Sequence, residues 1–315
     1  MKAAIVKRYG PPQVARVTES PTPRPRPGQV RVRVAVAAVT AGDARIRAAR
    51  FPQGFGLVAR LVYGLRGPRI GVLGSVFSGV VDAVGTGVDS LSPGDEVCGM
   101  AGQRMGTHAE YVVVPAARAV RRPAGVSHED AAGVLFGGTT ALHFLRDEAA
   151  LKPGASVLVN GASGAVGTNA VQLAKHLGAR VTGVTSTPNM DLVAELGADR
   201  TVDHTTTDVV SLTERFDVVL DTVGNLSPAS GRGLLDEGGV LLLAAAGLRD
   251  VVRARGNVRA GAAPERPEDF AHLLGLVADG VLTPVIDRID PLEEIAEAYR
   301  RVDSGHKVGN VLIRP

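Results

Sequence analysis

Cysteine, aromatic residues and long apolar runs are scarce in this chain of 315 residues. A single cysteine, Cys98, excludes an internal disulfide and a structural zinc site built from several cysteines, and it suits a reducing cytoplasm. The chain has no tryptophan, and aromatic residues make up 3% of it, which argues against base-stacking surfaces for nucleic acid. Apolar runs such as 240–248 are too short to span a bilayer, and the N-terminus lacks the apolar core of a signal peptide. The composition therefore predicts a cytoplasmic protein with neither a membrane nor a nucleic acid as partner.

Excess charge is also small. The net charge is +3 at pH 7, which by itself implies no nucleic-acid partner although the pI is about 9.2. Hydrophobic residues make up 45% of the chain and charged residues 21%, as in soluble globular proteins of one large or two ordinary domains. The basic residues Arg253, Arg255 and Arg259 leave RNA binding open, and a solvated edge explains them equally well.

The most informative segment is 157–178, which predicts a buried strand, a glycine-rich turn and an amphipathic helix in that order. Small residues in such a turn let the backbone approach a pyrophosphate, and the helix N-terminus presents free N–H groups to it. Because the flanking strand and helix are both present, we interpret the turn as a dinucleotide-binding site rather than a packing turn. The predicted cofactor-binding residues of the turn are Gly161, Ala162, Ser163, Gly164, Ala165, Val166 and Gly167.

The rest of the chain divides into three stretches. Residues 1–125 are rich in predicted strands, with a helix at 41–49 and a long Gly/Pro-punctuated loop at 51–70. Residues 126–260 alternate strands and helices, which is typical of a parallel sheet covered on both faces. Helices are expected near 131–145, 166–177, 189–196, 206–214, 227–236, 267–279 and 291–302. Strands are expected near 30–36, 80–84, 96–99, 111–114, 155–160, 180–185, 200–203, 216–221, 239–246, 285–289 and 308–313.

Several short motifs occur in an order and spacing that resemble those of the medium-chain dehydrogenase/reductases, specifically the zinc-free quinone oxidoreductase or zeta-crystallin-like branch. They lie at 28–34, 79–85, 93–97, 106–111, 138–142, 160–167, 185–189, 196–199, 217–224 and 305–310. The resemblance implies an α/β fold with a GroES-like β-rich catalytic domain, formed by 1–125 and 261–315, and a Rossmann domain with a doubly wound parallel sheet, formed by 126–260. It also implies a homodimer paired through an edge strand of the Rossmann sheet. The run 240–246 could be that strand or a buried strand of a monomer.

The resemblance implies a nicotinamide cofactor, and the end of the second Rossmann strand selects its type. A carboxylate there would bind a ribose 2′-hydroxyl and repel a 2′-phosphate. This chain has the hydroxyl residues Thr185, Ser186 and Thr187 instead, followed by proline, so we expect NADPH (NADP) with Ser186 and Thr187 in contact with it. Further cofactor-binding residues implied by the resemblance are Thr140, Thr222, Val223, Gly224, Gly247 and Asn310.

Zinc ligands are missing at the places where zinc-using relatives carry them. Ala41 stands at the place of the catalytic cysteine, and Ser75 and Val76 stand at the His-Glu place. The seven histidines show no paired ligand spacing. We therefore expect no metal site.

Without a metal as Lewis acid, alcohol oxidation is disfavoured. The reaction that remains feasible is hydride transfer from NADPH to an electron-poor acceptor, namely a quinone or an α,β-unsaturated carbonyl compound (enone). The resemblance implies Thr40 and Asp43 as catalytic candidates, because they stand where relatives carry Asn-x-x-Asp near the nicotinamide, although Thr40 departs from that pattern. Tyr63 and His108 are the other candidate proton donors beside Asp43, and each of these residues also has an ordinary structural explanation. The loop 51–63 is apolar, which suggests that the small-molecule substrate is apolar and fairly bulky; the alternative is that these residues only roof the β-rich domain. Two alternatives stay open: a non-catalytic NADPH-binding protein with a structural or redox-sensing role, and a pathway-specific enoyl or ketone reductase.

Overall fold

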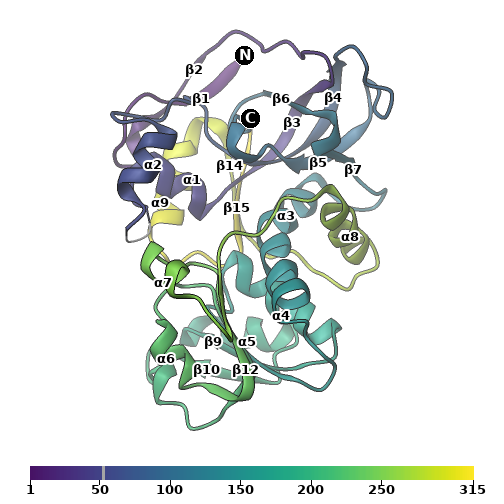
Figure 1. Cartoon of the computed structure of the whole chain (residues 1–315). Coiled ribbons are helices and arrows are strands. Elements are labelled where there is room, and N and C mark those ends of the chain that lie inside the picture. The colour runs from purple at the N-terminus through teal and green to yellow at the C-terminus, as the bar shows by residue number, and fades with distance from the viewer. Residues whose placement is uncertain (52–53) are drawn as a thin grey trace.

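Two stacked lobes make up the chain in a computed structural model that describes residues 1–51 and 54–315 (Figure 1). Both termini lie in the upper lobe, and the middle of the chain forms the lower lobe. Helix α3 (His128–Leu142) lies between the lobes, because it packs against strands of the upper lobe and a helix of the lower one. Among the described residues, none of the helices combines the length and apolarity that a membrane crossing needs.

The lower lobe is built on six parallel strands: β8 (Ser156–Asn160), β9 (Arg180–Thr185), β10 (Arg200–Asp203), β11 (Phe216–Asp221), β12 (Leu235–Leu243) and β13 (Val258–Ala260). Their order is β10-β9-β8-β11-β12-β13, so the winding reverses between β8 and β11. That order is the doubly wound arrangement, in which ligands bind outside the carboxyl ends of the strands at the reversal. The predicted Rossmann fold is confirmed. β12 pairs on both sides and β13 forms the edge, so the strand portion of the run 240–246, which ends at Leu243, is an interior strand and not the edge strand.

The helices of the lower lobe are α4 (Ala165–His176), α5 (Met190–Glu195), α6 (Pro228–Arg232) and α7 (Leu248–Arg253). The expected helix at 206–214 is wrong, because only a 3-10 turn forms there, at Val209–Ser211. The side chain of Asp208 accepts a hydrogen bond from the N–H of Val210 and caps this short turn, and the threonines before it disfavour a longer helix. The helix expected at 227–236 ends at Arg232, because β12 begins three residues later.

The upper lobe contains a seven-stranded sheet: β3 (Gln29–Val39), β4 (Val76–Val84), β5 (Glu96–Met100), β6 (Tyr111–Pro115), β7 (Ala119–Arg121), β14 (Ile286–Pro291) and β15 (Asn310–Arg314). A separate antiparallel pair consists of β1 (Lys2–Val6) and β2 (Ala15–Glu19). β3 shows the predicted alternation, with Val30 and Val32 completely buried. β15 pairs with β3, so the two ends of the chain meet in one sheet. The predicted GroES-like β-rich lobe is confirmed, while the domain boundaries stay a prediction.

The helices of the upper lobe are α1 (Ala41–Ala48), α2 (Gly56–Tyr63) and α9 (Ile295–Asp303), and α8 (Pro267–Ala278) packs against α3 and β7. The interpretation of 51–70 as a loop is therefore wrong at α2, although residues 52–53 lie outside the described part of the chain. Glycine at both ends of α2 resembled loop punctuation, and most of its apolar side chains face solvent, so no core-facing pattern marked it as a helix.

Candidate active site

A cleft of about 970 Å³ lies between the lobes, where the switch point of the Rossmann sheet opens. The carboxyl ends of β8, β9 and β11 form one side of the cleft, and the junction of β3 with α1 contributes to the other. The segment 302–310, which leads from α9 into β15, also lines it. The volume is at the upper end of the range for ligand pockets, which suits an extended ligand.

The glycine turn forms the floor of this cleft and leaves no room for side chains at two positions. Gly161 has a left-handed backbone with φ of 84°, and a Cβ there would lie 2.6 Å from the Thr222 hydroxyl oxygen. A Cβ on Gly167 would lie 2.7 Å from the Cα of Ala162, closer than real Cβ atoms come. Gly164 is the N-cap of α4 and offers no side chain to its first N–H groups. The turn therefore presents backbone donors and a positive helix end to the cleft.

The carboxyl end of β9 is lined by hydroxyl and amide groups. The hydroxyl of Thr185 donates to Ser163 Oγ over 2.8 Å, and Asn189 Nδ2 donates to Ser186 Oγ over 3.1 Å. Thr187 donates to the carboxylate of Asp203, and the pKa of that carboxyl is lowered by this bond and by bonds from Thr205. Ser186 lines the cleft, whereas neither Thr187 nor Asp203 does. The hydroxyl of Ser186 is therefore the one best placed for a ligand.

An acid that sequence reasoning did not single out holds the neighbouring turn. Asp221, the last residue of β11, is completely buried and accepts hydrogen bonds from Asn160 Nδ2 at 2.9 Å and from three backbone N–H groups. Those N–H groups belong to Val223, Gly224 and Leu226, at 3.0 to 3.2 Å. In the sequence, the one feature that could have pointed to Asp221 is the position of an acid at the end of an apolar strand. Asp221 thereby shapes the loop that carries the cleft residues Thr222 and Val223.

The segment before β15 lies directly on the glycine turn. Gly309 N–H donates to the carbonyl of Ser163 over 2.8 Å, and Gly309 forms an isolated bridge with Gly164. Lys307, also in this segment, lines the cleft and donates to the Gly309 carbonyl over 2.5 Å. Burial lowers the pKa of Lys307 to about 8, against the opposing effect of Asp287. Sequence reasoning missed Lys307, because the glycine turn against which its segment lies is distant in the chain.

Other cations also reach the cleft. Arg45 and Arg50, from α1 and the turn that follows it, line it together with Lys307. The cleft-lining acids are Asp208, which caps a 3-10 turn, and Asp303, which pairs with the buried Arg47 at 2.5 Å. The cleft therefore suits an anionic ligand.

The structure brings most of the predicted cofactor residues together. Nine of them line the cleft: Gly161, Ser163, Gly164, Ala165, Val166, Ser186, Thr222, Val223 and Asn310. Ala162 and Gly167 lie beneath the turn, and Thr140 donates to the carbonyl of Phe136 within its own helix. Thr187, Gly224 and Gly247 do not line the cleft either.

Among the catalytic candidates, only Thr40 reaches the cleft. Its hydroxyl donates to Asp43 Oδ2 over 2.7 Å and accepts from the Asp43 N–H at 3.2 Å, which forms a capping box at the start of α1. Asp43 is 1% exposed and lies behind Thr40. The proton of the Thr40 hydroxyl is thus directed at Asp43 and away from the cleft.

Tyr63 and His108 lie elsewhere. Tyr63 lines a separate cavity of about 210 Å³ and stacks on Phe51 with ring centroids 5.9 Å apart, and burial raises its pKa. His108 is buried, with Nε2 3.1 Å from the carbonyl of Ala38, so Nε2 carries a proton and donates it. Nδ1 then accepts from the Tyr299 hydroxyl at 3.2 Å, and burial lowers the pKa of His108. The neutral imidazole is therefore committed to structural hydrogen bonds.

No group of three or more His, Cys, Asp or Glu side chains in the described part of the chain is arranged to hold a metal ion. Cys98 is buried, and burial raises the pKa of its thiol to about 12, which disfavours the thiolate that a metal requires. The donor set present in and near the cleft does not fit zinc.

Two family models match this chain. Residues 26–124 match the alcohol dehydrogenase GroES-like domain, and residues 196–313 match a model described as zinc-binding dehydrogenase. The second match covers strands of both lobes, but the zinc in its description does not fit the donor set described above.

Curated relatives share about a third of the aligned residues. The chain is 32% identical to a 2-methylene-furan-3-one reductase of Solanum lycopersicum and 31% identical to a chloroplastic NADPH-dependent alkenal/one oxidoreductase of Arabidopsis thaliana. Each alignment covers 76% of this chain, and the chain spans about three fifths (62%) of those two proteins. A trans-enoyl reductase of Aspergillus terreus is 31% identical, with 76% of each chain covered. The solved quinone oxidoreductase of Coxiella burnetii superposes with a TM-score of 0.89 at 28% identity, covering 100% of this chain and 99% of that one.

Proposed function

Because the chain belongs to the medium-chain dehydrogenase/reductase superfamily, we propose that it is an NADPH-dependent oxidoreductase that reduces a quinone or an α,β-unsaturated carbonyl compound. The observation that carries the proposal is the glycine turn, which opens onto the cleft between the lobes at the switch point of the sheet. The names of the relatives reported above describe oxidoreductases of alkenals, enones and quinones, and this supports the proposed substrate class.

The residues of the cleft fit a dinucleotide phosphate. The free N–H groups at the start of α4 would hold the pyrophosphate, and Lys307 supplies a positive charge beside that turn. Ser186 would contact the 2′-phosphate, because no carboxylate lines the cleft at the end of β9. When bound, the nicotinamide supplies the hydride, and the surrounding protein supplies orientation and polarity.

We propose a zinc-independent reaction, because the donor set does not fit the metal. Thr40 is then the one catalytic candidate that lines the cleft, and it would donate to a substrate oxygen only after its hydroxyl turns away from Asp43. Asp43 acts as a positioning residue, since its carboxylate holds the Thr40 hydroxyl and the first turn of α1. The predicted homodimer and cytoplasmic location stay predictions.

The proposal is tested by mixing the protein with NADPH and a panel of naphthoquinones and enones in a stopped-flow spectrophotometer. We expect loss of NADPH absorbance with at least one panel member. Tight NADPH binding by calorimetry without turnover across both panels would favour the non-catalytic alternative, and turnover confined to enoyl thioesters would favour the pathway-specific one. Absence of NADPH binding would contradict all three.

A carboxylate at position 186 should reverse the preference between cofactors. In Ser186→Asp, repulsion of the 2′-phosphate is expected to weaken NADPH binding about tenfold or more, while NADH binding stays level or improves. Calorimetric Kd values for both cofactors measure this. Thr213→Asp is the control, because it adds the same charge at an exposed position of the lower lobe that does not line the cleft. Equal effects of the two substitutions would contradict the assignment of Ser186.

NADPH affinity should fall as the solution becomes alkaline. Lys307 carries its charge below its pKa of about 8 and loses it above, so the Kd is expected to rise by up to ~10-fold per pH unit above that value. In Lys307→Met the Kd should be higher at pH 7 and nearly constant over the same range. Fluorescence titration of NADPH between pH 7 and 9 measures both. A wild-type Kd that does not change with pH would show that Lys307 does not face the phosphates.

A further inference from the structure

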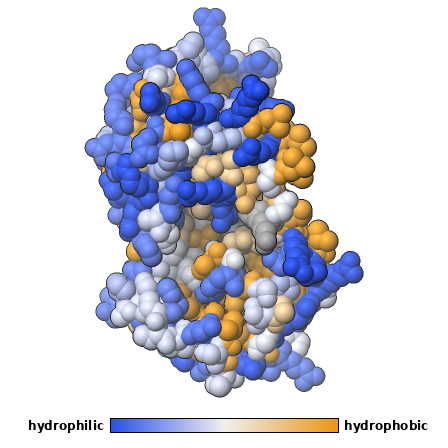
Figure 2. Space-filling model, turned by 90° about the vertical axis from the view of Figure 1, so that its left-hand side faces the viewer, coloured by the Kyte–Doolittle hydropathy of each residue, from blue (hydrophilic) through white to orange (hydrophobic). Residues whose placement is uncertain are grey.

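The outer face of α2 is apolar, although it is in contact with solvent. Its exposed apolar side chains, together with that of Leu65 two residues after the helix, form what we call the α2 patch: Leu57 (72% exposed), Val58 (54%), Leu61 (56%), Val62 (53%) and Leu65 (61%). Figure 2 shows apolar side chains gathered at the height of α2 and again at the height of α7, with hydrophilic side chains beside them. Single exposed leucines are ordinary, but a contiguous set on one short helix marks an interaction surface.

The α2 patch continues toward the lower lobe. A Cβ on Gly54, just before α2, would lie 2.9 Å from the Cβ of Leu248, the first residue of α7, so the two segments abut. Val252 of α7 is 64% exposed. Arg50, which lines the cleft, lies shortly before Gly54 in the chain. Exposed apolar side chains therefore lie on both lobes, and Figure 1 shows α2 above α7 on the same side of the molecule.

The charge around the α2 patch is predominantly positive. Residues 54–71 contain three arginines and no aspartate or glutamate, and α7 contains two arginines and one aspartate. These five arginines are Arg60, Arg66, Arg69, Arg249 and Arg253. None of them forms an ion pair with another described residue. Lys7 and Arg8 are also exposed and adjoin Gly67. The surface thus combines leucine and valine with unpaired cations.

We propose that the α2 patch docks on the surface of an anionic lipid bilayer. Leucine and valine side chains would enter the boundary between headgroups and acyl chains, while the arginines would contact lipid phosphates. A second copy of this chain fits less well, because two such surfaces would bring unpaired arginines together. The expectation of no membrane partner was based on the length of apolar runs, a criterion that detects spanning helices and not interfacial surfaces. This inference does not depend on the proposed function.

The test is co-sedimentation of the full chain with vesicles. We expect the protein to bind vesicles of phosphatidylcholine with phosphatidylglycerol, to bind vesicles of phosphatidylcholine alone much more weakly, and to dissociate as salt is raised. In Leu57→Glu/Leu61→Glu the partition should fall ~10-fold or more, because the substitutions remove apolar area and add negative charge. In Arg66→Gln/Arg69→Gln it should fall by a similar factor.

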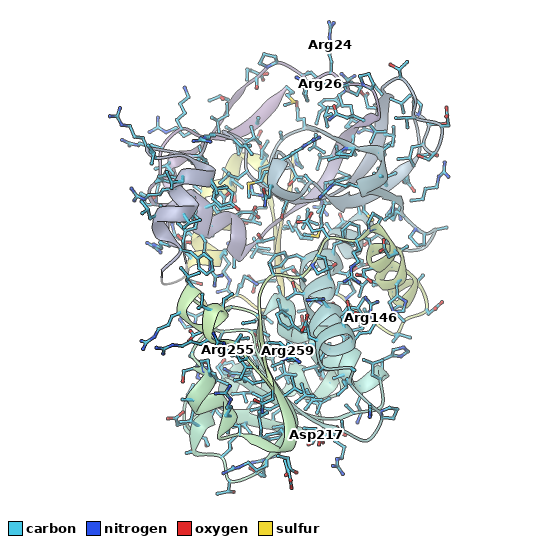
Figure 3. All side chains as sticks on the ribbon, in the orientation of Figure 1. Arg24, Arg26, Arg146, Asp217, Arg255 and Arg259 are labelled. Carbon is cyan, nitrogen blue, oxygen red and sulfur yellow. The ribbon has the colours of Figure 1, made fainter. Side chains whose placement is uncertain are left out.

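Matched controls separate the α2 patch from general effects. Val210→Glu places the same charge at a comparably exposed valine (46%) in the lower lobe, and Arg24→Gln/Arg26→Gln removes two cations at the far end of the upper lobe (Figure 3). Both controls should bind vesicles like the wild type, and thermal unfolding should confirm that all variants fold.

Three results would overturn the proposal. The first is no binding of the wild-type chain to anionic vesicles. The second is an equal loss of vesicle binding in the control variants, which would indicate that overall charge attracts the protein to vesicles and that no defined surface docks. The third is evidence that a protein, and not a bilayer, covers the α2 patch. Such evidence would be an oligomer in light scattering that dissociates in Leu57→Glu/Leu61→Glu, or saturable binding of an acidic soluble protein that excludes vesicles.

Discussion

Replacing Gly167 with alanine is expected to destabilise the protein by ~3 kcal/mol or more and to abolish measurable NADPH binding. The added Cβ would lie 2.7 Å from the Cα and 2.8 Å from the carbonyl carbon of Ala162, and closer still to the Gly161 carbonyl oxygen. All three are backbone atoms, so no side-chain rotation relieves the contact. α4 must move away from β8, and the turn that faces the cleft opens with it. Urea unfolding and calorimetric titration with NADPH measure the two effects.

Gly275→Ala is the matched control, because it makes the same change inside another helix. A Cβ there meets no atom within 4 Å, and α8 gains the better helix former, so we expect this variant to be more stable by about 0.5–1 kcal/mol. Its NADPH affinity should equal that of the wild type. If Gly167→Ala were as stable as Gly275→Ala, the close packing of α4 on the turn would be refuted.

Replacing Asp221 with alanine is expected to cost ~4 kcal/mol or more of folding free energy, because it leaves several donors buried without an acceptor. Three backbone N–H groups of the loop 223–226 and the Asn160 amide all donate to this carboxylate. Asp221→Asn keeps the volume but turns an NH2 group toward those donors, so we expect an intermediate loss. The loop would no longer be held over the cleft, and NADPH affinity should fall in parallel.

Asp217 provides the control on the same strand. It accepts from the N–H and hydroxyl of Ser156 at 2.7 and 2.8 Å, but it lies at the solvent-exposed end of β11, at the bottom of the molecule (Figure 3). Asp217→Ala should cost about 1 kcal/mol and leave NADPH affinity unchanged. Similar losses for Asp217→Ala and Asp221→Ala would mean that burial does not determine the cost.

Local patterns were sufficient for most of the secondary structure. β8, β9 and α4 lie within a residue or two of their predicted ranges, because a buried strand and an amphipathic helix each have a period that can be read within the segment itself. The same approach failed at 206–214 and at α2. In the first, side-chain hydrogen bonds compete with the helix, and in the second the apolar face meets solvent instead of the core.

The sequence alone determined the alternating strands and helices of the lower lobe, most strands of the upper lobe and the glycine turn, since each of these patterns lies within one segment of the chain. Tertiary structure decided which polar groups act together at the cleft. It placed the segment that carries Lys307 on a turn more than a hundred residues earlier, committed Thr187 to Asp203, and buried His108 away from the cleft. The periodicity of a segment predicts which of its faces is buried, but it carries no information about which distant residue that face will contact. The chemistry of a site depends on those tertiary contacts.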